Sequence, residues 1–184
     1  MNLQQAAKLA LVTSFVVPLL AGCITSEKPL SEKKDKDDAL LGTWVSQPPK
    51  GEKPTKVTFA GDADGWYKLA MFDTKADGTE KQENYRAYPT LTQKNRYLNV
   101  DINTAEGKPP SYMFFKYTIN NDKMAVYTLS RTKVNAAINA NKLKGVPGAK
   151  PFDDPVIKED DLLAILEKKS YFDKPMTFKK VESK

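Results

Sequence analysis

Between residues 40 and 130 the chain alternates apolar and polar residues in short stretches, and turn-forming residues separate these stretches. Successive side chains of a β-strand point to opposite faces, so a period of two predicts strands. We expect seven strands, at 40–46, 56–60, 66–72, 81–88, 96–102, 111–119 and 123–130. The short links predict antiparallel neighbours, and so many sequential hairpins are expected to remove their exposed edges by closing into a barrel.

Helical periodicity appears only after this meander. Residues 132–143 place Val134, Ala137 and Ile138 on one stripe, and a second helix is expected from the acidic residues 159–161 to Lys168 or Lys169. A last strand at 176–181 can pair beside the first strand. The predicted fold is therefore mainly β, an antiparallel meander that closes into a barrel of about eight strands with two helices before the last strand.

Residues 1–22 have the three-part pattern of a secretory signal peptide. A polar start with Lys8 precedes the apolar residues 9–20, and the small residues Ala21 and Gly22 follow. The apolar run is shorter than the ~20 residues of a membrane-spanning helix, and Pro18 interrupts it. We expect this segment to be removed during export.

The sequence Leu20-Ala21-Gly22-Cys23 resembles the lipobox of bacterial lipoproteins. The resemblance implies cleavage before Cys23, a diacylglycerol such as a palmitate-containing one on its sulfur, and an acylated amino group. Several acyl chains hold a protein stably at a membrane. Because Ile24 rather than an acid follows, the resemblance also implies a cell-envelope location, lipid-anchored in the outer membrane and facing the periplasm. The alternative is an ordinary signal peptide with an incidental cysteine.

The stretch after the cysteine is almost entirely polar and charged. Such a composition buries too little apolar surface to order itself, so residues 23–38 are predicted to be a lipidated cysteine followed by a flexible tether. The folded domain is then expected to occupy residues 39–184.

The lack of histidine and the presence of a single cysteine exclude most enzyme classes. The chain has no histidine, and Cys23 is its single cysteine. Ser-His-Asp and Cys-His catalysis and the usual zinc ligand sets are therefore missing. Acids at Asp62, Asp64 and Asp101 have no spacing that marks a catalytic pair or an EF-hand calcium loop. We expect no enzymatic activity, no cofactor and no metal, and the formal charge of +6, spread among many acids, does not indicate nucleic-acid binding.

Gly42-x-Trp44 on the first strand, together with Arg131 after the meander, resembles the signature of the lipocalin and fatty-acid-binding (calycin) proteins. The resemblance implies that Trp44 closes the barrel floor, that Arg131 stacks on it as a cation–π partner, and that Gly42 lets the backbone bend. The alternative is that Trp44 is a core aromatic of another β-rich domain.

If the barrel encloses a cavity, five aromatic side chains are expected to line it: Tyr67, Tyr85, Tyr97, Phe115 and Tyr127. Such a pocket would be apolar with hydroxyl groups, and would suit a small apolar or amphipathic ligand. Two alternatives stay open, namely a solid aromatic core and an exposed aromatic surface for a protein partner. The predicted function is thus a membrane-anchored, periplasm-facing ligand binder, or else an envelope interaction or assembly lipoprotein that docks a protein partner.

Overall fold

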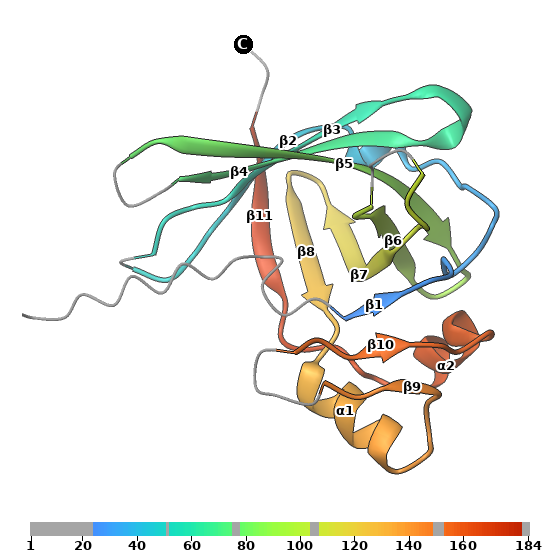
Figure 1. Cartoon of the computed structure of the whole chain (residues 1–184). Helices are drawn as coiled ribbons and strands as arrows, with labels where there is room; N and C mark the ends of the chain where they lie inside the picture. Colours follow the sequence, from blue (N-terminus) through green and yellow to red (C-terminus); the bar gives the residue numbers. More distant parts are fainter. Residues whose placement is uncertain (1–23, 51, 75–77, 104–106, 149–152, 182–184) are drawn as a thin grey trace, which may run out of the picture.

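The computed structural model describes residues 24–50, 52–74, 78–103, 107–148 and 153–181. Eight antiparallel strands close into a barrel, because β7 pairs with β6 as well as with β8 (Figure 1). The predicted fold class is confirmed. These strands are β2 (Gly42–Ser46), β3 (Lys56–Gly61), β4 (Tyr67–Thr74), β5 (Glu80–Leu91), β6 (Arg96–Asp101), β7 (Tyr112–Asn120), β8 (Lys123–Thr128) and β11 (Met176–Val181).

Two helices precede the last strand, as the sequence predicts. They are α1 (Arg131–Asn139) and α2 (Leu162–Lys168). Three two-residue strands were not predicted: β1 (Thr25–Ser26), β9 (Gly145–Val146) and β10 (Val156–Ile157). β1 pairs with the first residues of β7, which lie outside the part of β7 that pairs with β8. β10 pairs with β1, and β9 pairs with β10, so the three short strands extend the sheet from this end of β7.

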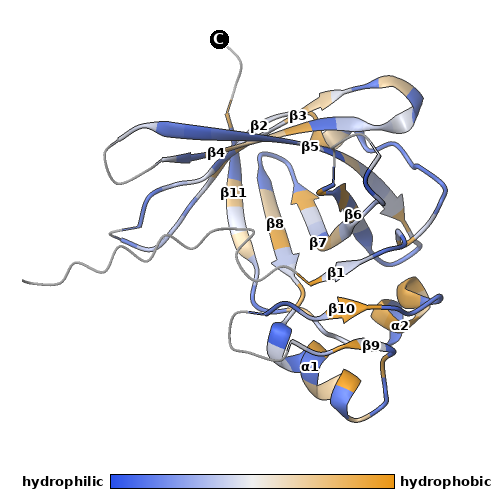
Figure 2. Cartoon of the chain, in the orientation of Figure 1, coloured by the Kyte–Doolittle hydropathy of each residue, from blue (hydrophilic) through white to orange (hydrophobic). Residues whose placement is uncertain are grey.

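The side chains pack into two apolar cores, one on each face of the sheet. The inner core fills the barrel and includes Trp44, Leu98, Val100, Phe115 and Phe178. The outer core lies between the outside of the barrel and the two helices, and it includes Ile24, Tyr97, Phe114, Ile157 and Leu166. Figure 2 shows the apolar residues of α2 and β10, which belong to this outer core. Alternation along β6 and β7 therefore divides their residues between two buried environments.

Residues 24–38, here called the N-terminal strap, lie along the outside of the barrel. Ile24 and Leu30 are buried in the outer core, and the Leu30 amide donates to Asn99 Oδ1 over 2.8 Å. Further along, the Asp35 amide donates to the Pro89 carbonyl. The predicted flexible tether over residues 25–38 is wrong, because two apolar side chains and a series of hydrogen bonds secure this polar segment. The folded domain includes residues from Ile24 onward, so the predicted boundary at residue 39 is also wrong.

The two ends of the barrel differ. The 3₁₀ helix η1 (Asp38–Leu40) joins the strap to β2 and covers one end, the closed end, where Leu40 is 1% exposed. At the opposite end, the mouth, the β4–β5 hairpin projects beyond the strands around it (Figure 1). Figure 2 shows that this projecting part is largely hydrophilic. A second 3₁₀ helix, η2 (Ala63–Gly65), forms the turn between β3 and β4 at the closed end.

Candidate functional site at the barrel mouth

The inside of the barrel has very little free space. Its cavity is about 50 Å³ and is lined by apolar side chains and the ring of Tyr117: Leu40, Val57, Phe59, Leu69, Met71, Leu98, Phe115, Tyr117, Met124, Val126 and Phe178. Ligand-binding cavities usually measure ~300–1,000 Å³. The interior is therefore a packed core, which agrees with the solid-core alternative for this part of the barrel.

A larger hollow of about 530 Å³ lies at the mouth. Its lining residues are Thr25, Tyr85, Ile102, Ser111, Met113, Asp154 and Val156. Met113, Tyr85 and Ile102 also belong to or pack against the inner core, so they form an apolar floor. Thr25 and Ser111 add polar atoms to the lining. The hollow thus combines a volume in the usual range of small-molecule sites with an apolar floor and a few polar groups.

The projecting hairpin places charged side chains on the same face of the sheet as this floor. On β4, Asp73 lies two residues after Met71 and so points to the same face. On β5, Glu83 and Lys81 lie two and four residues before Tyr85 and so share its face. Glu83 accepts hydrogen bonds from the Lys81 ammonium over 2.5 Å and from the Tyr85 hydroxyl over 2.8 Å. These bonds hold the pKa of Glu83 below its usual value. Burial, with help from the Glu83 charge, raises the pKa of Asp73.

The rim of the mouth carries an ion pair between Arg131, the first residue of α1, and Asp154. Arg131 follows β8 where that strand ends at the mouth, whereas Trp44 lies near the closed end. The predicted stacking of Arg131 on Trp44 is therefore wrong. The cation over the Trp44 ring is the ammonium of Lys180, 5.2 Å from the ring centre. The sequence signal for Lys180 was its alternation with Phe178 on β11, which turns both toward the barrel interior.

Gly42 and Trp44 lie on β2, which follows η1 at the closed end. Trp44 is fully buried, and its indole nitrogen donates to the Leu40 carbonyl over 2.8 Å. Gly42 has a φ of 111°, in the region that favours glycine, and a Cβ there would come within 3.1 Å of Lys180 Cε.

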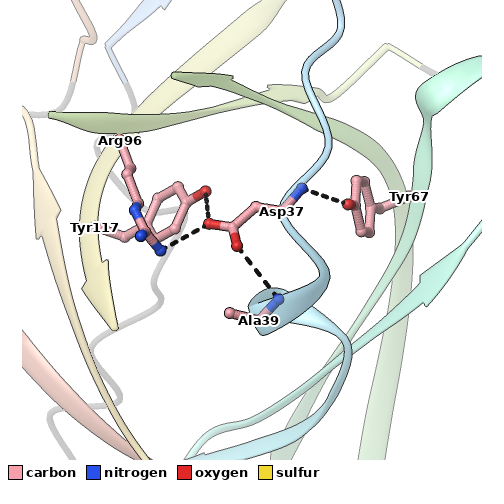
Figure 3. A network of polar contacts seen from close by, with 5 residues as sticks. All are labelled: Asp37, Ala39, Tyr67, Arg96 and Tyr117. Atoms are coloured by element: carbon pink, nitrogen blue, oxygen red, sulfur yellow. Dashed lines mark hydrogen bonds and ion pairs between the residues drawn. The ribbon is translucent and has the colours of Figure 1, made fainter. Parts of the chain in front are cut away.

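A polar network with Asp37 at its centre completes the closed end (Figure 3). Asp37 Oδ2 accepts from the Tyr117 hydroxyl over 2.9 Å and from Arg96 over 3.0 Å, and Asp37 Oδ1 accepts from the Ala39 amide over 3.2 Å. The Asp37 amide donates to the Tyr67 hydroxyl over 2.9 Å. Burial and the nearby carboxylate raise the pKa of Tyr117, so its hydroxyl remains a donor. Sequence reasoning missed this network because Asp37 was assigned to the tether.

The five predicted pocket residues do not share one cavity. Phe115 and Tyr67 are in the inner core, but the Tyr67 hydroxyl bonds the strap at the closed end. Tyr97 is buried in the outer core, where its hydroxyl donates to Glu167, and Tyr127 packs against the same core. Tyr85 alone among the five lines the mouth. The prediction of a single pocket lined by all five is therefore wrong, because the alternation along the strands sends them to different faces.

Cys23, the predicted lipidation site, lies outside the described residues. Among the residues that the structure does describe, no helix has the length and apolar character needed to cross a membrane. Across the same ranges, no group of acidic, histidine or cysteine side chains is arranged to hold a metal ion. No protein-family model, curated protein or solved structure matches the chain.

Proposed function

We propose that this chain is an envelope lipoprotein, anchored through lipid on Cys23, whose barrel binds a small amphipathic ligand at its mouth. The anchor rests on the lipobox pattern before Cys23. The observation that carries ligand binding is the hollow of about 530 Å³ at the mouth, which combines an apolar floor with polar groups. The filled interior argues against a ligand deep in the barrel, since only about 50 Å³ is free there.

The lining of the mouth defines the chemistry of such a ligand. An apolar part would lie against Ile102, Met113 and the Tyr85 ring. A polar part would meet Ser111 and Asp154 at the rim, where Arg131 already partners Asp154. The ligand is therefore a molecule with an apolar portion and a hydrogen-bonding head.

The test uses the mature domain with Cys23→Ser and a lipophilic fluorescent probe, N-phenyl-1-naphthylamine. We expect the probe to bind, and we expect Ser111→Trp to weaken binding at least about tenfold, because the indole fills part of the hollow. Thr118→Trp is the matched control, because Thr118 is exposed on β7 near the closed end. Equal probe binding by both variants, or none by the parent domain, would contradict the ligand site. Native mass spectrometry of the domain purified from cells then identifies a bound natural ligand.

The lipid anchor has a separate test. Cells grown with labelled palmitate are expected to incorporate label into this chain, and Cys23→Ser is expected to abolish both the label and the association with membranes. A Cys23→Ser chain that still sediments in full with the envelope fraction would disprove the anchor.

One observation favours the alternative function, docking of a protein partner. Residues 80–84 of β5 pair with β4, but no described strand pairs with their other edge. An unpaired edge can accept a strand from another protein. A photo-crosslinking residue at Gln82 is expected to capture an envelope protein in cells under this alternative, while the same residue at Thr118 is not.

A further inference from the structure

The residues directly after the predicted lipidation site already pack against the barrel. Ile24 is only 4% exposed and belongs to the outer core. The next two residues, Thr25 and Ser26, form β1 and are paired on both sides, with β7 and with β10. The chain is therefore held in the fold from the residue directly after Cys23.

Thr25 also lines the hollow at the mouth. Two residues of chain span at most about 7 Å. The lipidated residue is thus bonded within this distance of the mouth rim, whatever conformation its own backbone adopts. The lipid and the open end of the barrel are at the same end of the molecule.

The closed end lies far from this attachment point. β7 runs from the mouth, where it pairs with β1, toward the closed end, and it has nine residues. At ~3.3 Å per residue it is about 30 Å long. A bilayer that holds the acyl chains must therefore pass close to the mouth, whereas the closed end can be distant from it.

From this geometry we propose that the barrel mouth faces the phospholipid surface into which Cys23 is anchored. The proposal rests on the lipid anchor of the proposed function and adds the orientation of the domain and the source of its ligand. A ligand enters the mouth from the membrane side, so its class is a membrane-resident amphiphile. The closed end and the Asp37 network point away from the bilayer.

The test uses the full acylated chain in phosphatidylcholine vesicles. Since Cys23 is the single cysteine and its sulfur carries lipid, an introduced cysteine offers the one free thiol for a fluorophore. Ser111→Cys places the fluorophore at the mouth, and Asp122→Cys places it in the exposed turn between β7 and β8 at the closed end. Phospholipids with a nitroxide on the headgroup quench fluorophores near the membrane surface.

We expect quenching at position 111 to be several-fold stronger than at position 122. Equal quenching, or stronger quenching at 122, with the protein still bound to vesicles would overturn the proposed orientation. Loss of vesicle binding, together with a mass spectrum that shows no acyl group on Cys23, would overturn the proposed anchor instead. The two failures are therefore distinguishable.

A linker variant tests the cause of the orientation. A flexible Gly/Ser linker of about 20 residues between Cys23 and Ile24 gives a root-mean-square reach of about 25 Å. The domain is then free to rotate, so quenching at position 111 is expected to fall toward that at position 122 while the protein stays on the vesicles. Unchanged quenching at position 111 would overturn the argument that the short connection sets the orientation.

Discussion

The ammonium of Lys180 lies 5.2 Å from the centre of the Trp44 ring, and the two residues are directly opposite in the β11–β2 pairing. Gly42, with no side chain, leaves room for the Lys180 stem, whose Cε would be 3.1 Å from a Cβ at that position. The lipocalin resemblance assigns this cationic role to Arg131. In the structure, Lys180 on β11 rather than Arg131 supplies the cation over the Trp44 ring.

Replacing Lys180 by Met is expected to destabilise the domain by about 0.5–2 kcal/mol, because the apolar stem is kept and the cation–π contact is lost. Lys180→Arg is expected to retain most of the stability. The measurement is urea unfolding of the Cys23→Ser domain. Lys179→Met, at an exposed position of the same strand, serves as the control and is expected to stay within about 0.5 kcal/mol of the parent. Equal losses for the two Met variants would contradict the contact.

Asp37→Ala is expected to cost about 1–3 kcal/mol, because the buried hydroxyl of Tyr117 and the amide of Ala39 lose their acceptor. A double-mutant cycle with Tyr117→Phe checks the mechanism. In the Tyr117→Phe background, which lacks the hydroxyl, Asp37→Ala should lower the free energy of unfolding by a measurably smaller amount. Strictly additive losses in unfolding experiments would show that the two side chains do not act together.

Glu167 is expected to make stability depend on pH. Burial opposes its ionisation, but hydrogen bonds from Asn95, Tyr97 and Thr92 prevail and hold its pKa below the ordinary 4.5. The unfolded chain therefore binds a proton more readily than the folded one, so this stabilisation is present above about pH 4.5 and is lost as the pH falls through the folded-state value.

Glu167→Gln removes that contribution. We expect it to cost about 1 kcal/mol near pH 7, the difference between charged and neutral hydrogen bonds, and much less near pH 3. The measurement is the urea concentration at the midpoint of unfolding, compared between parent and variant at the two pH values. Glu159→Gln, on the loop before α2, provides a control for acids outside this cluster. A loss for Glu167→Gln that is independent of pH would contradict the assignment.

Leu30→Ala tests the strap. Leu30 is buried in the outer core, so its truncation is expected to cost about 2–5 kcal/mol. In a flexible tether the same change would have no effect on stability. Thermal unfolding of the Cys23→Ser domain measures the difference, and Ser31→Ala, a neighbouring change of small size, is the control. A silent Leu30→Ala would restore the tether prediction.

The barrel strands could be predicted from the sequence because their inner residues alternate regularly. Leu98 and Val100 read as one apolar face of β6, and they do fill the barrel. Asn99 points to the opposite face of the strand, where it is fully buried. Its amide is satisfied by the Leu30 amide, the Tyr88 carbonyl and the Thr90 hydroxyl. The alternation of residue types indicates that the two faces of a strand differ. It does not indicate that segments distant in sequence will cover the polar face.

The strap and the mouth could not be predicted for related reasons. The strap has only two deeply buried apolar side chains before Asp38, and its remaining stability comes from hydrogen bonds to groups such as the Pro89 carbonyl, which composition does not reveal. β5 was expected to end at Tyr88, but it continues to Leu91. Pro89 lies past the part of β5 that pairs with β4, so its missing amide hydrogen breaks no ladder bond with β4, and its carbonyl accepts from the Asp35 amide of the strap. The two-residue strands around the mouth are too short to show any periodicity.

The pairing of β1 also orders events during biosynthesis. Thr25 and Ser26 pair with Tyr112 and Met113 on one side and with Val156 and Ile157 on the other, so the full ladder cannot form until most of the polypeptide has been synthesised. Contacts so distant in sequence close late, after local hairpins have assembled. Thr25 and Ser26 consequently take their paired places only when the carboxy-terminal third of the chain, which contains β10, is present to complete the ladder.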